Sequence, residues 1–233
     1  ATCRPLPLSQ DIDMRTGMAV LSLMTVATSL FGQRSALREV RDRGSFGVNV
    51  VVAQPLGAFR RTGSVAPGLN GFVVLGGPVL GWRIDGAWMV YDSRYQGYGV
   101  STTSQIGTLA IGPQLTIGQG PMRLYGFATA GGSLFWSNAS YGGGCGCYDS
   151  DDFFLDGDFT TTTSAGAGLL ITVARKRAPI AIDLGVRAVR HDRVEYVPAG
   201  GLTQNPDGTF SAQRVETPVE LRVFQIGVSI GIR

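Results

Sequence analysis

Eight segments of this chain place an apolar residue at every second position, and the gaps between the segments alternate between long and short. The clearest segment is residues 81–94, GWRIDGAWMVYDSR, in which Ile84 and Trp88 alternate with Arg83 and Asp85. Successive side chains of a β-strand point to opposite faces, whereas a helix would scatter these two sets around its circumference. The pattern therefore predicts an all-β chain whose strands each have one apolar and one polar face.

The expected strands are separated by tight turns at every second connection and by long polar loops at the others. We place the strands at residues 46–55, 69–77, 81–94, 106–117, 123–136, 160–174, 180–191 and 219–233. Glycine and proline mark the tight turns near residues 78 and 118–122, and a basic stretch forms the third at 175–179. Pro113 lies inside the fourth strand, where it removes one ladder hydrogen bond, and we attribute it to a local bulge.

Composition excludes several classes of protein. No apolar run of 18 residues occurs after about residue 35, which excludes membrane-spanning helices from the body of the chain. The formal net charge of +3 is too small to indicate a nucleic-acid partner. A length of 233 residues suits one domain with eight membrane-crossing strands and their loops.

The amino-terminal part of the chain has the features of an export signal. Met14 and Arg15 provide a basic start, and residues 18–32 provide an apolar core of export length. We expect a signal peptide at residues 14–36, a periplasmic lead-in at 37–44 and the barrel at 45–233. Residues 1–13 contain no initiating methionine and are expected to be an upstream non-native or unstructured segment. A longer export signal and a single-helix anchor are the alternatives.

Periodicity alone does not decide which face of each strand meets the solvent. In a soluble barrel the apolar face lines the interior, whereas in a membrane barrel lipid covers the apolar face and the lumen holds polar groups. The export signal, the alternation of long and short connections, and a polar face that combines charges with glycine favour the membrane barrel. A soluble periplasmic binding barrel, which would be extracted without detergent, is the alternative.

On these residues the chain resembles the eight-stranded outer-membrane β-barrel superfamily, the OmpA/OmpX-type transmembrane domain. The resemblance covers roughly residues 44–233 and depends on VVVAQPLGAF, GWRIDGAWMVYDSR, RLYGFATAGGSLFW and the alternating last strand. It implies an antiparallel up-and-down transmembrane β-barrel with long external loops and short periplasmic turns. Members commonly end on an aromatic residue, whereas this chain ends Gly231-Ile232-Arg233, so either its end is clipped or its targeting signal is atypical.

Four charged residues on the predicted polar faces are the main candidates for a site inside the barrel. Arg83 and Asp85 belong to the third strand and Asp183 and Arg187 to the seventh, so they should lie on opposite walls at similar depths. An eight-stranded barrel is just wide enough for side chains to fill, so we expect these groups to meet near the axis. A charge network that fills the lumen is the favoured interpretation, and a narrow polar conduit is the alternative.

We expect the aromatic residues near the strand ends and the single histidine to lie at the surface of the barrel. We expect Trp82, Trp88, Tyr125 and Trp136 to form interfacial girdles at headgroup depth, with ligand stacking as the alternative. Enzymes of this scaffold that act on lipid A use a histidine with a serine and an acid near the outer rim. The deacylase pattern His-x-Ser is absent, so we expect His191 to be a surface residue at the rim and the protein to have no catalytic activity.

The longest predicted loop, residues 137–158, contains two cysteines and several acids. Cys145 and Cys147 would face an oxidising compartment, where a small loop disulfide or two unpaired thiols are both open, and they are too few for a tetrahedral zinc site. We expect the acidic side chains of the loop only to keep it well solvated. A weaker hypothesis is that they bind calcium ions that bridge to lipopolysaccharide phosphates. These acids are Asp149, Asp151, Asp152, Asp156 and Asp158.

The expected function follows from the architecture. We predict an outer-membrane protein with a structural, surface-interaction or adhesion role and a largely side-chain-filled lumen. The alternative is a small porin-like channel or a binding barrel for ions or small amphipathic solutes. We expect no cofactor, metal or nucleic acid. Expected partners are membrane lipid, lipopolysaccharide and, during biogenesis, the barrel assembly machinery, and we expect a monomer.

Overall fold

A computed structural model describes residues 43–61, 63–97, 100–118, 120–141, 151–174, 178–197, 202–204 and 210–232. The predictions for residues 1–13, for the signal peptide at 14–36 and for residues 37–42 lie outside the described residues. Cys145, Cys147 and Asp149 lie outside them as well.

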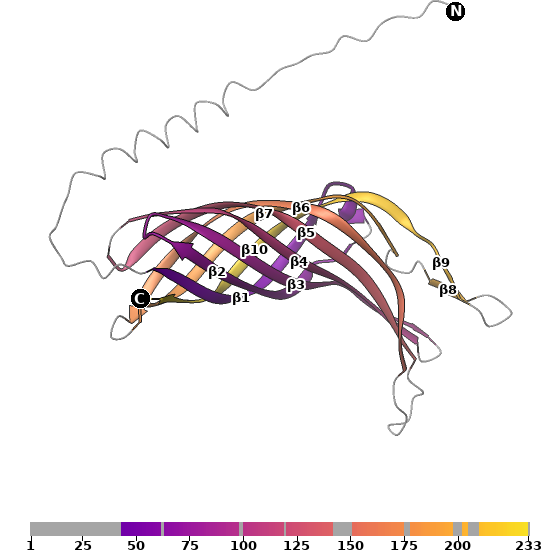
Figure 1. Cartoon of the computed structure of the whole chain (residues 1–233). Coiled ribbons are helices and arrows are strands. Elements are labelled where there is room, and N and C mark those ends of the chain that lie inside the picture. Colours follow the sequence, from indigo (N-terminus) through magenta and orange to yellow (C-terminus); the bar gives the residue numbers. More distant parts are fainter. Residues whose placement is uncertain are drawn as a thin grey trace, which may run out of the picture. The chain divides into compact units, whose positions relative to one another are not determined.

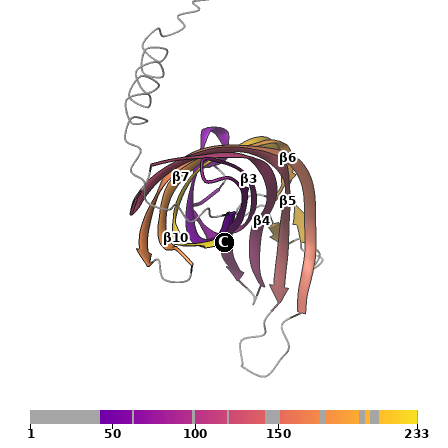
Figure 2. The same cartoon turned by 60° about the vertical axis from the view of Figure 1, so that its left-hand side comes forward.

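Eight antiparallel strands form a closed barrel in which each strand pairs with its neighbours in the chain and the last strand pairs with the first (Figures 1 and 2). The strands are β1 (Gly44–Leu56), β2 (Ala66–Gly76), β3 (Leu80–Gly97), β4 (Val100–Ile117), β5 (Met122–Tyr141), β6 (Asp151–Ala174), β7 (Ile180–Tyr196) and β10 (Val215–Ile232). The predicted fold class, an eight-stranded antiparallel up-and-down barrel, is confirmed.

Shorter elements occupy the long connections. A 3-10 helix, η2 (Gly57–Arg61), follows β1, and the strands β8 (Leu202–Gln204) and β9 (Phe210–Ala212) pair with each other between β7 and β10. No helix among the described residues is long and apolar enough to cross a bilayer.

Glycine permits the tight turns at one end of the barrel. Gly76 has a φ of 132° where β2 turns into β3, and Gly118 and Gly120 have φ values of 107° and 100° where β4 turns into β5. A side chain at these φ values would be strained, so glycine is the residue that these turns require. We call this end, which also holds the start of β1 and the end of β10, the short-turn rim, and the opposite end the long-loop rim.

The four strands β3 to β6 extend farther at their long-loop ends than the sequence pattern predicts. Much of the predicted loop after residue 94 is paired strand, with Tyr95 opposite Ser101, and part of the predicted loop at 137–158 is paired, with Ser140 opposite Asp152. These extensions carry polar residues on both faces, so they lack the alternation that marks a strand beside lipid. Backbone hydrogen bonds, which need no apolar face, hold them together.

The predicted bulge at Pro113 is wrong. The pairing of β4 with β5 keeps one register from Ile111 opposite Ala130 to Gln114 opposite Phe127, and Pro113 lies opposite Trp82 of β3 in an unbroken ladder. Register shifts occur elsewhere, such as between Pro218 and Val219 of β10, where β7 gains Asp192 as an extra residue.

Candidate functional site

The outer surface of the barrel is apolar and the interior is polar over most of its height. Val48 is 59% exposed, Leu124 62% and Ile226 57%, whereas Arg83 and Asp183 are 1% and 0% exposed. A barrel in water would reverse this arrangement, because apolar side chains at the surface gain nothing from water and buried charges lose their hydration. The surrounding medium that suits this surface is hydrocarbon, so the predicted orientation of the two faces holds.

Arginine in place of Ile226 should destabilise the barrel in a lipid bilayer. Ile226 faces outward and precedes Ile232, at the short-turn end of β10, by six residues, which places it about 15 Å from that end in a tilted strand. This is near the middle of an apolar band about 25 Å tall, where an arginine costs about 2–4 kcal/mol of unfolding free energy. Urea titration of the refolded barrel in lipid vesicles would measure the loss.

Ile232→Arg is the matched control, because it adds the same side chain to the same face of the same strand at the edge of the band. The expected loss there is about 0–1 kcal/mol. Equal losses for Ile226→Arg and Ile232→Arg would mean that no hydrocarbon band surrounds the barrel.

Arg83 of β3 lies at the centre of a polar layer inside the barrel. Its Nε and Nη2 donate hydrogen bonds to the two carboxylate oxygens of Asp85 at 2.7 and 2.9 Å, and its Nη1 donates to Oε1 of Gln114 at 2.9 Å. The guanidinium carbon also lies 4.0 Å from the ring centroid of Phe72 and 4.4 Å from that of Phe127. A buried guanidinium needs this degree of satisfaction, because an unpaired one would cost several kcal/mol.

The layer continues across the lumen from Asp85. Asn70 donates to Oδ1 of Asp85 at 3.2 Å and accepts from Asn49 at 3.3 Å, so β1, β2 and β3 are joined by side chains. Nη1 of Arg187, on β7, lies 3.7 Å from the same Oδ1. Arg187 and Asp85 come from opposite walls of the barrel and meet inside it.

Asp183, the fourth of the predicted lumen charges, has neutral partners beside it. It accepts a hydrogen bond of 2.6 Å from the Tyr125 hydroxyl and one of 3.2 Å from Nε2 of Gln225. Gln225 also donates to the Tyr125 oxygen at 2.9 Å. The structure therefore brings Arg83, Asp85 and Arg187 into contact and holds Asp183 in an adjoining group of β5, β7 and β10.

The interfacial prediction for Tyr125 is wrong. Its ring is 4% exposed and points into the barrel, where its hydroxyl bonds Asp183 and Gln225. Tyr125 shares its face of β5 with Arg123 and Thr129, and this alternation in the sequence is the signal that assigns it to the interior. The same alternation assigns Asn49, Gln114 and Gln225 to the interior, where all three are buried.

An aromatic cap fills the barrel on the long-loop side of the polar layer. Phe59 of η2 folds into the mouth and is fully buried, with its ring 5.6 Å from Tyr91 and 5.5 Å from Tyr196 in edge-on contacts. Tyr91 and Tyr196 meet each other at 6.0 Å, and Phe135 and His191 pack edge-on at 5.2 Å. Buried aliphatic side chains of β1, β2, β3, β4, β7 and β10 complete the cap. We use "aromatic cap" for these five rings and the aliphatic residues around them.

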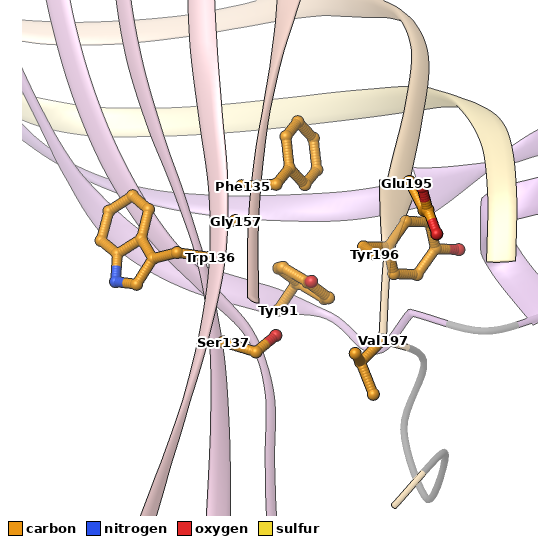
Figure 3. A pocket seen from close by; sticks show the side chains of 8 residues that line it. All are labelled: Tyr91, Phe135, Trp136, Ser137, Gly157, Glu195, Tyr196 and Val197. Atoms are coloured by element: carbon orange, nitrogen blue, oxygen red, sulfur yellow. The ribbon is translucent and has the colours of Figure 1, made fainter. Parts of the chain in front are cut away.

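The cap leaves little free space. In Figure 3, Tyr91 and Tyr196 approach each other between the strands, and the hollow that they line with Phe135 and Val197 has no room for a water molecule. Phe135 and Trp136 leave opposite sides of β5, so the phenyl ring lies inside the barrel and the indole outside it (Figure 3).

The prediction that His191 is a surface residue is wrong. The side chain is 3% exposed and lies inside the barrel against Phe135. Within the described part of the chain, neither ring nitrogen has a hydrogen-bond partner. His191 is therefore part of the aromatic cap, where no described serine or acid forms a hydrogen bond with its ring.

Three of the predicted girdle residues do face outward. Trp82 and Trp88 are 61% and 44% exposed, and Trp136, which is half-buried, lies over Gly107 of the next strand. The Trp88 indole donates a hydrogen bond of 2.8 Å to Gln105 on the outer surface. Their depth relative to lipid headgroups stays a prediction.

The calcium hypothesis concerns residues of which few are described. The side chains of Asp151, Asp152 and Asp156 are outside the described structure, and Asp158 accepts backbone hydrogen bonds from Phe159 and Glu195, both at 2.8 Å. Asp158 thus links β6 to β7 through its carboxylate. Among the described residues no group of three or more histidine, cysteine or acidic side chains is placed to hold a metal ion.

Comparisons with known proteins find similar architecture among solved structures. No protein-family model matches the sequence, and no curated protein matches it. Similar solved structures include Neisserial surface protein A (14% identity, 82% of this chain and 99% of that chain, TM-score 0.47). They also include a major outer membrane protein from Thermus thermophilus (13% identity, 80% and 98%, TM-score 0.44) and Ail from Yersinia pestis in a phospholipid nanodisc (13%, 81% and 99%, TM-score 0.36).

The two surfaces of the barrel indicate where the chain is located. A closed barrel satisfies every backbone group between its strands and so can cross a bilayer, and an apolar exterior around a polar interior is the arrangement of bacterial outer-membrane barrels. The chain is an eight-stranded transmembrane β-barrel of the outer membrane.

Proposed function

We propose that this protein is a non-conducting outer-membrane barrel with a structural or surface-interaction role. The observation that carries the proposal is that two layers in series fill the lumen: the polar layer around Arg83 and the aromatic cap below the long-loop rim. An ion crossing the barrel would have to displace Phe59, Tyr91 and Tyr196 and then break the Arg83–Asp85 pair. Each of these steps removes buried contacts that the fold depends on.

The refolded wild-type barrel should give no stepwise currents in a planar lipid bilayer. The reason is that the buried rings of Phe59, Tyr91 and Tyr196 contact one another across the mouth, so a hydrated ion would have to displace them. Insertion would be verified in the same preparation by circular dichroism and by resistance of the strands to protease. Reproducible single-channel steps from the inserted protein would contradict the proposal and favour the porin-like alternative.

A loop exchange would separate a surface-interaction role from a purely structural one. Replacing residues 142–150, which connect the long strands β5 and β6, with a short glycine-serine linker leaves the barrel wall intact. If the protein acts by surface interaction, cells carrying this variant should lose adhesion to other surfaces and keep normal resistance to detergent. Unchanged adhesion together with normal detergent resistance would instead favour a structural role carried by the barrel wall.

A further inference from the structure

The outer face of β7, β10 and β1 changes from apolar to polar at one height near the long-loop rim. Along β10 the outward side chains change from Phe224 to Arg222, which is exposed, and along β1 they change from Val52 to Gln54. Along β7 the corresponding change ends at Arg190, whose side chain is 75% exposed. These residues lie on adjacent strands, with Arg222 opposite Gln54 on one side and Ala188 on the other.

This height coincides with the edge of the hydrocarbon. Arg222 precedes Ile232 by ten residues, Arg190 follows Ile180 by ten and Gln54 follows Gly44 by ten. Ten residues of a strand tilted by about 40° rise about 25 Å along the barrel axis, which equals the height of the apolar band of such barrels. The two arginines therefore lie at headgroup depth in the outer leaflet.

A second pair of arginines belongs to the helix that packs against β10. η2 packs against β10, and a methyl group at Gly57 would lie 3.4 Å from a carboxylate oxygen of Glu220. Arg60 and Arg61 of this helix are both exposed. We call Arg60, Arg61, Arg190 and Arg222 the basic cluster.

The basic cluster has an excess of positive charge. Glu220 is the acid among these arginines, and it is held by Arg190, whose Nε and Nη2 donate to its Oε1 at 3.0 and 2.7 Å. In the described part of the chain Arg60, Arg61 and Arg222 have no hydrogen-bond or ion-pair partner. Four arginines and one glutamate leave a net charge of +3. Farther out on the rim, the charges nearly cancel among Asp192, Arg193, Glu195, Arg214 and Glu216.

The described side chains on the opposite side of the barrel are neutral at this height. There the outward residues are Trp88, eight residues from the start of β3, and Gln105, twelve residues from the end of β4, and they hydrogen-bond each other. Among the side chains that the structure describes at this height, the basic character is confined to one side of the barrel, which distinguishes it from a uniform polar rim.

We propose that the basic cluster binds the phosphate groups of lipid A, the phosphorylated lipid of the outer leaflet. Guanidinium groups match phosphate oxygens with paired hydrogen bonds, and Arg222 lies where a headgroup phosphate lies when its acyl chains cover Phe224 and the aliphatic residues below it. The inference depends on the position of the barrel in the membrane and not on whether the lumen conducts.

Arg222→Gln should weaken the binding of diphosphorylated lipid A about fivefold, the effect of one arginine at an anionic membrane surface. The triple variant that also carries Arg60→Gln and Arg61→Gln should show a larger loss. The full barrel in neutral detergent would be titrated with lipid A, and native mass spectrometry would count the lipid that stays bound. Arg43→Gln is the matched control, because Arg43 is an exposed arginine at the short-turn rim, and it should bind lipid A as the wild type does.

Two further lipids, dephosphorylated lipid A and phosphatidylglycerol, test whether the phosphate groups of lipid A are what the basic cluster binds. Removing both phosphates from lipid A should weaken its binding to the wild type at least as much as the triple substitution weakens the binding of diphosphorylated lipid A. Equal binding of the phosphorylated and dephosphorylated lipids would overturn the proposal, since the acyl chains alone would then account for it. Equal binding of phosphatidylglycerol would overturn the assignment to lipid A. Because the exchanged side chains are exposed, the variants should retain wild-type circular dichroism.

Discussion

Asp85→Ala should lower the free energy of unfolding by about 3–5 kcal/mol, the effect of removing one partner from a buried ion pair. Asp85 receives two hydrogen bonds from Arg83 and one from Asn70, and Arg187 lies 3.7 Å from the same carboxylate. Without the carboxylate, two guanidinium groups face each other inside the barrel with no negative charge between them. Urea titration of the barrel in lipid vesicles, followed by tryptophan fluorescence, would measure the loss.

A double variant distinguishes the effect of an unpaired charge from the effect of lost side-chain packing. Arg83→Met combined with Asp85→Leu removes the closest ion pair and keeps apolar volume in the lumen, but Arg187 still loses its carboxylate partner, so the double variant should recover only part of the stability that Asp85→Ala loses. Asp85→Asn, which keeps a hydrogen-bonding group without the charge, should fall between the wild type and Asp85→Ala. If Asp85→Ala costs less than about 1 kcal/mol, the typical value of a single neutral hydrogen bond, the polar layer is not an ion-paired network.

Phe59→Ala should also cost about 3–5 kcal/mol, because it removes a large ring from a packed interior and leaves a cavity. The ring is fully buried and forms edge-on contacts with Tyr91 and Tyr196. The loss would be measured by the same urea titration. The variant should also make η2 more susceptible to protease, because Phe59 is the residue of η2 that enters the barrel.

Arg60→Ala is the matched control for Phe59→Ala, since Arg60 belongs to the same helix and is exposed. Its expected effect on stability is within about 0.5 kcal/mol. Similar losses of stability for Phe59→Ala and Arg60→Ala would show that the first loop does not seal the mouth of the barrel. Only the polar layer would then support the proposal that the lumen does not conduct.

The barrel wall could be predicted from the sequence because its signal is local. Each strand beside lipid repeats with period two, and Arg83 and Asp85 are assigned to the interior by their position between Ile84 and its apolar neighbours. The strand extensions at 95–104 and 137–141 consist mostly of polar residues and glycine, so their sequence carries no such signal. Tyr125 lies close to the turn at 118–122, as a girdle residue would, but its alternation with Leu124 is what assigns it to the interior.

The contacts inside the barrel could not be predicted in the same way. The hydrogen bond from Gln225 to Tyr125 joins residues 100 positions apart, and the Tyr125–Asp183 bond joins residues 58 apart. Which of these groups meet depends on the register with which all eight strands close. His191 likewise enters the aromatic cap because β7 continues past the predicted strand end and remains part of the wall.

By itself, the sequence determined that this chain forms eight strands, each with one apolar and one polar face. In any pleated strand, a two-residue repeat places alternate side chains on opposite faces, so the apolar set lies together on the face that lipid covers. Only the tertiary structure decided that Phe59 of the first loop closes the mouth and that Asp85 is shared by Arg83 and Arg187. Those choices arise when the barrel closes, because closure sets the distances between residues that the chain itself keeps far apart.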